Sequence, residues 1–363
     1  MIYLYSLGVF TAVVTLLTVF LLLAEKFLAD YGICEVSINS GERSFEIDGG
    51  GTLLSALSEN EIFIPSACGG KGSCGYCKLT ILSGAGQTLP TERPFLSRKE
   101  IRSNVRLACQ VKVKEKLDLR IPEEILNVKL YKSEVRSIRD LTYDIKEVCF
   151  SLLEPDQISF HPGQYAQVLA PGPDGDVFRA YSISSPVNVT DSVELNVRLI
   201  PGGIASTYIH SLQVGDPVTF TGPFGEWRLS EDPESELVCV GGGVGMAPMK
   251  SLIYSIYHRW PERTCWFFFG CRGSDDIFYL DEFKQLQAKH PNFHLYYALS
   301  DMKPGQVWDG EKGFIHLAVD KYLEPGPKKQ AFLCGPPPMI EAVTAILHEK
   351  GLSEADIFYD KFD

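Results

Sequence analysis

Four cysteines are spaced as the ligands of an iron–sulfur cluster are. Cys68, Cys74 and Cys77 lie in the glycine-rich segment CGGKGSCGYC and Cys109 lies in LACQ, so the pattern is C-x5-C-x2-C-x31-C. Each iron of a [2Fe–2S] cluster needs two soft sulfur ligands, and the glycines let the loop bring backbone N–H groups close to the sulfides. The first gap is one residue longer than in the plant-type run, C-x4-C. The pattern predicts a [2Fe–2S] cluster at these thiols.

A structural zinc site and disulfides are the alternatives for these cysteines. Zinc sites usually pair two C-x2-C knuckles, and the chain has one. The remaining six of the ten cysteines are scattered, mostly in apolar segments, so the cysteine content does not indicate an oxidising compartment. A reduced, cytosol-facing protein with a cluster is the simpler interpretation.

A second group of candidate residues lies in a strand-rich segment, residues 127–230. Six short stretches of alternating polarity, separated by turns, predict a closed antiparallel barrel. Arg179 can bind a pyrophosphate through paired charged donors, Tyr181 can lie against a flavin ring, and Ser182 can donate a hydrogen bond near the ring nitrogen that receives hydride. Taken alone, these residues also fit an ordinary strand with a surface arginine.

Two later segments make a flavin site the better interpretation. Gly202 and Gly203 form a turn that leads through Ser206 into a predicted helix, whose free N–H groups and positive dipole end suit a phosphate. Gly222-Pro223-Phe224-Gly225 then closes the barrel. Three such segments in this order predict a bound flavin.

The region from Glu236 to the C-terminus alternates strands and helices, which predicts a parallel sheet with crossover helices. LVCVGGGVGMAP predicts a strand, a glycine turn and a helix, a nucleotide-binding unit in which Met246 replaces the third glycine of the usual fingerprint. Cys334-Gly335-Pro336 lies at the carboxyl end of another predicted strand, where ligands of open α/β sheets bind. Cys334 fits a small core residue, but its position favours a residue on the nicotinamide side.

The choice between NADH and NADPH depends on the segment after the second strand of this region. A 2′-phosphate needs basic partners there, and Asp275 and Asp276 would repel it, whereas Arg272 would attract it. The pair of carboxylates favours NADH.

The N-terminus differs in kind from the rest of the chain. No charged side chain occurs between Ile2 and Ala24, and a helix over this stretch is about 34 Å long, enough for a hydrocarbon core of about 30 Å. A cleaved signal peptide is the alternative, but it has a basic start and a small-residue cleavage site, and neither occurs here. The stretch predicts a single anchoring transmembrane helix.

Length and charge set the overall plan. The chain has 363 residues, which suggests two or three domains, and its net charge of −12 argues against nucleic acid as a partner. We expect a multidomain protein made of a transmembrane anchor at residues 1–31, an α+β ferredoxin-like (β-grasp) domain at 32–126, an antiparallel FAD-binding barrel at 127–230 and an α/β NADH-binding domain with a parallel sheet at 231–363.

These motifs together resemble a known superfamily. Arg179–Ser182, Gly222–Gly225, GGGVGMAP and CGPPPM, in this order, are similar to the ferredoxin–NADP⁺ reductase superfamily. The anchor, the cysteine spacing and the ending FYDKFD resemble the family of F subunits of sodium-translocating NADH:quinone oxidoreductases. The resemblance implies electron flow from NADH through FAD and the [2Fe–2S] cluster to integral membrane partner subunits and, through them, to quinone. It also implies a single-pass protein of the bacterial inner membrane whose cofactor domains face the cytoplasm.

The resemblance also assigns roles to residues. FAD is bound by Arg179, Tyr181 and Ser182 with Gly203, Ser206, Gly222 and Gly225 in support, the dinucleotide phosphates by Gly241, Gly242, Gly243 and Gly245, and the nicotinamide side by Cys334, Gly335 and Pro336. Ser182, Cys334 and Phe362 are the expected catalytic residues, since Phe362 matches the terminal aromatic residue that covers the flavin and swings aside. A frayed C-terminal tail is the alternative for Phe362.

Two other functions share parts of this plan. The reductase component of a multicomponent oxygenase has the same three modules but serves a soluble hydroxylase, so it has no need of an anchoring helix. A membrane redox sensor that only binds its cofactors would not turn over NADH. The N-terminal stretch favours the membrane complex over the oxygenase reductase.

Overall fold

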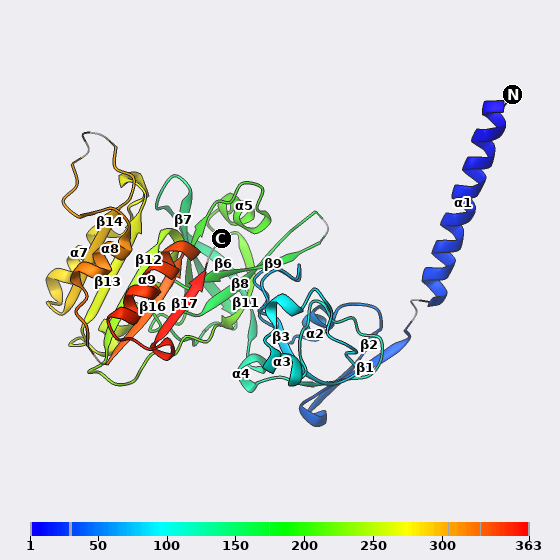
Figure 1. The fold of residues 1–363 in the computed structure, drawn as a ribbon, viewed down its shortest axis with the longest axis horizontal. Helices are drawn as coiled ribbons and strands as arrows, with labels where there is room; N and C mark the ends of the chain where they lie inside the picture. The colour runs from blue at the N-terminus through cyan, green and yellow to red at the C-terminus, as the bar shows by residue number, and fades with distance from the viewer. Residues whose placement is uncertain are drawn as a thin grey trace. The chain divides into compact units, whose positions relative to one another are not determined.

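The computed structural model describes residues 2–28, 31–173, 175–303, 305, 307–326 and 328–361, with side chains in the first helix described over 5–20. The chain divides into two compact units, Met1–Val128 and Lys129–Asp363, which are called here the cluster unit and the reductase unit (Figure 1).

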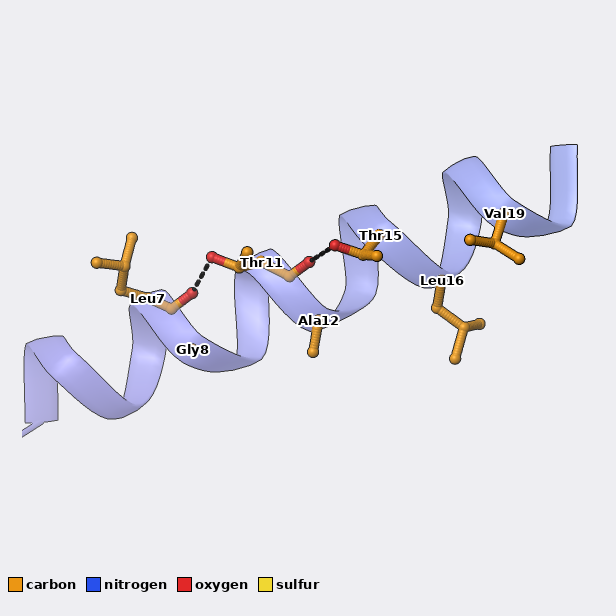
Figure 2. Close-up of a pocket in the computed structure, with 7 residues that line it drawn as sticks. All are labelled: Leu7, Gly8, Thr11, Ala12, Thr15, Leu16 and Val19. Carbon is orange, nitrogen blue, oxygen red and sulfur yellow. Dashed lines mark hydrogen bonds between the residues drawn. The ribbon is translucent and has the colours of Figure 1, made fainter. Parts of the chain in front are cut away.

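The cluster unit begins with helix α1, Ile2–Leu28. Its described side chains are apolar apart from Tyr5, serine and threonine hydroxyls, and Thr11 and Thr15 donate to the backbone carbonyls of Leu7 and Thr11 at 2.8 Å (Figure 2). In the part of the chain that the structure describes, no helix is both long and apolar enough to cross a membrane. The predicted anchoring helix is therefore not confirmed.

The remainder of the cluster unit is a five-stranded mixed sheet in the order β2-β1-β5-β3-β4. Alternation in EVSINS and SFEIDG predicts a β-hairpin, and it is confirmed, because β1, Ile33–Ile38, pairs antiparallel with β2, Arg43–Asp48. The other strands are β3, Lys78–Ser83, β4, Val105–Leu107, and β5, Leu117–Arg120. The segment TLLSALSEN predicts a short helix capped by Thr52, and helix α2, Leu53–Glu59, does start there, since the Thr52 hydroxyl accepts a hydrogen bond from the Ser55 backbone N–H.

The reductase unit opens with a six-stranded antiparallel sheet, as the sequence predicted. Its strand order is β10-β7-β6-β11-β8-β9, and a bridge between Ile183 and Leu195 connects its two ends. The strands are β6, Lys129–Asp140, β7, Ile145–Glu154, β8, Tyr165–Ala170, β9, Val177–Ser182, β10, Ser192–Arg198, and β11, Pro217–Phe224. Helix α5, Ile204–Ser211, follows β10. Alternate residues of these strands, Val148 and Phe150 among them, point inward and form one apolar core.

The C-terminal part of the reductase unit is the predicted parallel sheet, in the order β15-β14-β13-β12-β16-β17. Its strands are β12, Glu236–Gly242, β13, Cys265–Cys271, β14, Phe293–Leu299, β15, Glu311–Lys312, β16, Lys329–Gly335, and β17, Ile357–Lys361. The helices are α6, Met246–Arg259, α7, Leu280–Lys289, α8, Ile315–Tyr322, and α9, Pro337–Glu349.

Helices cover both faces of this parallel sheet, and Figure 1 shows α8 and α9 over it. Side chains of α6 and α7 pack with Cys239 and Phe267 on one face, while those of α8 and α9 pack with Val240 and Phe268 on the other. The strands are apolar throughout because both faces are covered. Such a sheet presents its ligand-binding edge at the carboxyl ends of its strands.

Candidate cofactor sites

The four predicted cluster ligands come together as two pairs of thiols. The Cys74 thiol donates to the Cys68 sulfur at 3.3 Å, and a second hydrogen bond joins Cys77 and Cys109. Over the described residues, no group of three or more His, Cys, Asp or Glu side chains surrounds a single point at which one metal ion would bind. Two thiol pairs match the two irons of a [2Fe–2S] cluster, each of which takes two sulfur ligands.

Each pair contains one thiol that ionises easily. The hydrogen bond from Cys74 lowers the pKa of the Cys68 thiol to about 4, and the same bond raises the pKa of Cys74. Likewise, the hydrogen bond with Cys77 lowers the pKa of Cys109 to about 7 and raises the pKa of Cys77. Since thiolates are the form that binds metal, both pairs are prepared for a cationic group.

The loop that carries three of these cysteines depends on glycine. Gly72 has a φ of +75° and Gly75 a φ of +71°, in the left-handed region that favours glycine. A Cβ atom at Gly75 would also lie 2.8 Å from the Phe95 ring, and one at Gly72 would lie 2.5 Å from Nε2 of Gln110. These glycines are therefore needed for the fold of the loop.

One detail of the prediction was wrong. The segment LACQVKV predicts a strand that carries Cys109, but β4 ends at Leu107 and the backbone turns there, where the Gln110 backbone N–H donates to the Leu107 carbonyl at 2.8 Å. The turn places Cys109 opposite the loop that carries the other three cysteines. An extended strand would carry Cys109 past that loop.

A buried ion pair lies beside this turn, and sequence reasoning missed it. Arg106 donates to both carboxylate oxygens of Glu92 and to the carbonyls of Ala85 and Gly86, while Glu92 also accepts from the Leu89 and Leu107 amides. Glu92 is fully buried. Burial opposes its ionisation, but the hydrogen bonds from Arg106 and the two amides outweigh it and lower the pKa of Glu92. We call these contacts the Glu92 network.

The predicted flavin segments lie on neighbouring strands of the barrel. Strand β8 pairs on one side with β9, where Arg179 and Ser182 face Val168 and Tyr165, and on the other side with β11. The Tyr165 ring stacks on Phe224 with centroids 5.5 Å apart. Two motifs more than thirty residues apart in the sequence, Arg179–Ser182 and Gly222–Gly225, thus flank one strand.

The polar groups of this region are available for a ligand to different degrees. Arg179 forms no ion pair within the described residues and donates to the carbonyl of Phe178. Burial raises the pKa of Tyr181 to about 12, so its hydroxyl stays protonated. Ser206, by contrast, uses its hydroxyl inside the turn, where it accepts from the Ile200 amide. Gly203 is the N-cap of α5, which leaves the first N–H groups of the helix for an anion.

The glycine turn and the CGPPPM motif also meet. Gly241 on β12 faces Cys334 on β16, and a Cβ atom at Gly245 would lie 2.0 Å from the Cys334 carbonyl oxygen. Gly335 has a φ of +154° and, like Gly242, lies against Met339. The Cys334 thiol itself is completely buried and packs in the core, so its observed surroundings are those of a packing residue. Burial raises the pKa of this thiol.

Asp360 is a partly buried carboxylate at the same edge of the sheet, and sequence reasoning did not select it. It faces Cys334 across β16 and β17. Burial raises the pKa of Asp360 to about 6. The predicted lid residue, Phe362, lies outside the described residues.

A second buried network joins the barrel to the α/β part of the reductase unit. Lys250 on α6 forms ion pairs with Glu194 and with Glu147, the latter at 3.2 Å. The Tyr279 hydroxyl donates to Glu147 and, at 3.0 Å, to the amide oxygen of Asn196. Burial opposes ionisation of Glu147, but the charge of Lys250 leads the groups that lower its pKa. We call these contacts the Glu147 network.

The two carboxylates expected to select NADH take part in contacts within the protein. Asp276 caps a short turn by accepting from the Gly273 amide at 3.0 Å, and Asp275 pairs with Lys303 at 3.5 Å. Both carboxylates stay on the same short segment as Arg272. NADH in preference to NADPH remains a prediction.

Three family models match the chain in the predicted order. The 2Fe-2S iron-sulfur cluster binding domain matches residues 36–114, the oxidoreductase FAD-binding domain matches 132–229, and the oxidoreductase NAD-binding domain matches 239–345. The cofactors implied are a [2Fe–2S] cluster, FAD and NAD(H).

Similar proteins extend the match to nearly the full length. The F subunit of the Na(+)-translocating NADH-quinone reductase of Actinobacillus succinogenes is 37% identical across 99% of this chain and 98% of its own, and that of Neisseria meningitidis serogroup B is 37% identical across 97% of both. Among solved structures, the Amycolatopsis cytochrome P450 reductase GcoB has a TM-score of 0.72 and 29% identity, covering 91% of this chain and 98% of its own. A ferredoxin reductase in carbazole 1,9a-dioxygenase has a TM-score of 0.69 and 25% identity over the same shares.

Proposed function

The chain belongs to the family of F subunits of the Na(+)-translocating NADH-quinone reductases, and from this premise we propose how its own residues carry electrons out of NADH. It is an FAD- and iron–sulfur-dependent NADH oxidoreductase. When bound, FAD takes two electrons from NADH as a hydride and passes them singly to the [2Fe–2S] cluster, so the protein supplies binding, orientation and electrostatics.

Cys68 and Cys74 would hold one iron of the cluster, and Cys77 and Cys109 the other. The donor set fits, because four thiols from two distant segments form two pairs, and each pair contains one thiol with a lowered pKa. This pairing is the observation that carries the proposal. It supports a two-iron cluster over one zinc ion, which would need all four sulfurs around a single point.

Arg179 and the N-terminus of α5 would hold the pyrophosphate of FAD, and Tyr181 and Ser182 would contact its ring system. Arg179 has a guanidinium free of ion pairs within the described part of the chain, and Gly203 leaves the α5 amides open. Ser206 would act indirectly, by closing the turn that presents those amides. Gly225 keeps the opposite strand close to β8, because its φ of +118° favours glycine and a Cβ atom there would lie 3.3 Å from the Gln164 backbone. A Cβ atom at Gly222 would make only ordinary contact with Tyr165.

Gly241 to Gly245 and the first turn of α6 would bind the phosphates of NADH. The turn lies directly against Cys334 and Gly335, so the dinucleotide would run along the carboxyl edge of the sheet. Cys334 would shape the nicotinamide side through packing, because its thiol is buried. Phe362 would cover the flavin until NADH displaces it.

We further propose that the chain works at the bacterial inner membrane with integral membrane subunits that pass electrons on to quinone, and that its cofactor domains face the cytoplasm. Support for attachment through α1 comes from its exposed apolar side chains, such as Phe10 and Leu16, and from the threonine hydroxyls that donate to its own backbone (Figure 2). In hydrocarbon, polar groups need such internal partners.

The reductase of a multicomponent oxygenase is a second candidate, favoured by the fold shared with GcoB and the carbazole dioxygenase reductase. Removal of residues 2–28 separates the two functions. We expect the truncated protein to keep NADH oxidation with ferricyanide and to lose quinone reduction in membranes. Unchanged quinone reduction would remove the main support for the membrane complex.

The central experiment is an anaerobic NADH titration of the purified protein, followed by visible spectra and EPR. We expect bleaching of a flavin and the EPR signal of a reduced [2Fe–2S] cluster. Cys77→Ser should abolish the EPR signal of the cluster and preserve ferricyanide reduction by NADH, which needs only the flavin. A wild-type protein that contains zinc and gives no iron–sulfur signal would contradict the proposal.

A further inference from the structure

Gln110 follows the fourth cluster ligand directly, and its side chain turns back onto that ligand. The Gln110 amide nitrogen, Nε2, lies 3.7 Å from Sγ of Cys109, within hydrogen-bond distance for sulfur. The same amide lies against the ligand loop, because a Cβ atom at Gly72 would approach Nε2 to 2.5 Å. A glycine at position 72 therefore makes the room in which this amide sits.

A second contact orients the amide. The Thr91 hydroxyl donates to Oε1 of Gln110 at 2.9 Å, which leaves Nε2 as the end that points to the sulfur. Thr91 is itself held in place, since the next residue, Glu92, is fully buried and bound by Arg106. The Glu92 network thus holds the segment of Thr91 in place, and Thr91 in turn orients the side-chain amide of Gln110.

We propose that Gln110 raises the reduction potential of the cluster by donating a hydrogen bond from its amide to the sulfur of Cys109. The inference rests on the proposed function, because it requires a [2Fe–2S] cluster at these four cysteines. Reduction adds one electron, makes and breaks no covalent bond, and leaves more negative charge on the sulfur ligands. A donor aimed at one of those sulfurs stabilises the reduced form more than the oxidised form.

The direction of the effect matters for electron flow. A higher reduction potential at the cluster makes electron transfer from the flavin more favourable, so Gln110 would favour the step from the flavin to the cluster.

The test is a potentiometric titration of the full-length holoprotein, followed by cluster EPR and flavin absorbance. Gln110→Leu removes the donor at similar size. Loss of one hydrogen bond to a charged group should reduce the equilibrium constant for cluster reduction about tenfold, which is a shift of about 59 mV to more negative potential for one electron. The flavin potential should not move. Gln87→Leu, the same change at an exposed glutamine of the neighbouring loop, is the matched control and should leave both potentials unchanged.

A second pair of variants avoids the ligand loop altogether. Thr91→Val removes the group that orients the amide and should shift the cluster potential in the same direction by a smaller amount, whereas Thr91→Ser keeps the hydroxyl and should match the wild type. If Gln110→Leu fails to assemble a cluster, the Thr91 pair decides. Wild-type potentials in both Gln110→Leu and Thr91→Val, or in Thr91→Val alone when Gln110→Leu has no cluster, would overturn the inference. A wild-type protein with no [2Fe–2S] signal would instead overturn the proposed function.

Discussion

The cluster unit and the reductase unit both bury carboxylates beside cations, but the two networks connect different things. In the Glu92 network the partners lie 14 residues apart and join one loop to the start of the turn that carries Cys109. In the Glu147 network the partners come from β7, β10, α6 and the segment before α7, and they join the barrel to the parallel sheet. The Glu92 network supports the turn of Cys109, one of the four predicted cluster ligands. The Glu147 network holds the barrel against the parallel sheet.

This difference suggests different consequences when each network is broken. Loss of the Glu92 network should disturb the cluster and leave the flavin reaction intact. Loss of the Glu147 network should disturb the approach of NADH to the flavin and leave the cluster intact. Buried ion pairs are weak sources of net stability, yet removal of one partner is costly because the other charge stays buried.

Arg106→Met should have the largest effect. It leaves the fully buried Glu92 without its cation, so we expect a loss of about 3–5 kcal/mol in the free energy of unfolding of the cluster unit. Denaturant unfolding and iron content measure the loss, and ferricyanide reduction by NADH should persist. The double variant Arg106→Met/Glu92→Leu should recover much of the stability. Equal instability of the single and double variants would show that packing, and not charge, is responsible.

Lys250→Met should have a smaller effect, because Arg139 still pairs with Glu147 at 2.9 Å. We expect a loss of about 2 kcal/mol from the hydrogen bonds to charged groups, and a slower reduction of the flavin by NADH. Stopped-flow absorbance measures the rate, and the cluster potential serves as the internal control. A variant that lost the cluster but reduced its flavin normally would reverse the assignment of the two networks.

The same contrast shows what the sequence could reveal. The cysteine spacing predicted that these four thiols come together, and the six strand-like segments predicted the antiparallel barrel, because both depend on short local patterns. LACQVKV suggested a strand through Cys109, whereas the turn at Leu107 is held by contacts that include the Glu92 carboxylate. The Glu147 network was not predictable, since its members lie between residues 147 and 279 and no local pattern relates them.

Asp360 sharpens the comparison, because it is a partly buried carboxylate that pairs with no cation in the part of the chain that the structure describes. Burial raises its pKa to about 6, whereas an unfolded aspartate has a pKa of about 3.9. Between these two values the folded protein keeps a proton that the unfolded chain releases, so the free energy of unfolding falls as the pH rises through this window. Above about pH 6 the full cost of the buried charge is present.

Asp360→Asn removes that charge. We expect the variant to be more stable than the wild type by about 1–2 kcal/mol at pH 8 and nearly equal to it at pH 4, after allowance for partial exposure of the site. Thermal unfolding across this pH range checks the sign. A gain that is the same at both pH values would mean that folding does not shift the pKa of Asp360 and that the gain has a cause other than charge.

The smallest predicted effect comes from a neutral contact that belongs to neither network. The Thr52 hydroxyl caps α2 by accepting from the Ser55 amide at 3.2 Å, so Thr52→Ala should cost about 1 kcal/mol in the free energy of unfolding of the cluster unit. Because the contact carries no charge, the loss should be the same at low and high salt and should leave the cluster potential unchanged. Thr52→Ser keeps the hydroxyl and should restore the stability. If Thr52→Ala moved the potential as far as Thr91→Val does, general loosening of the cluster unit would explain both shifts, and the specific contribution of Gln110 would be lost.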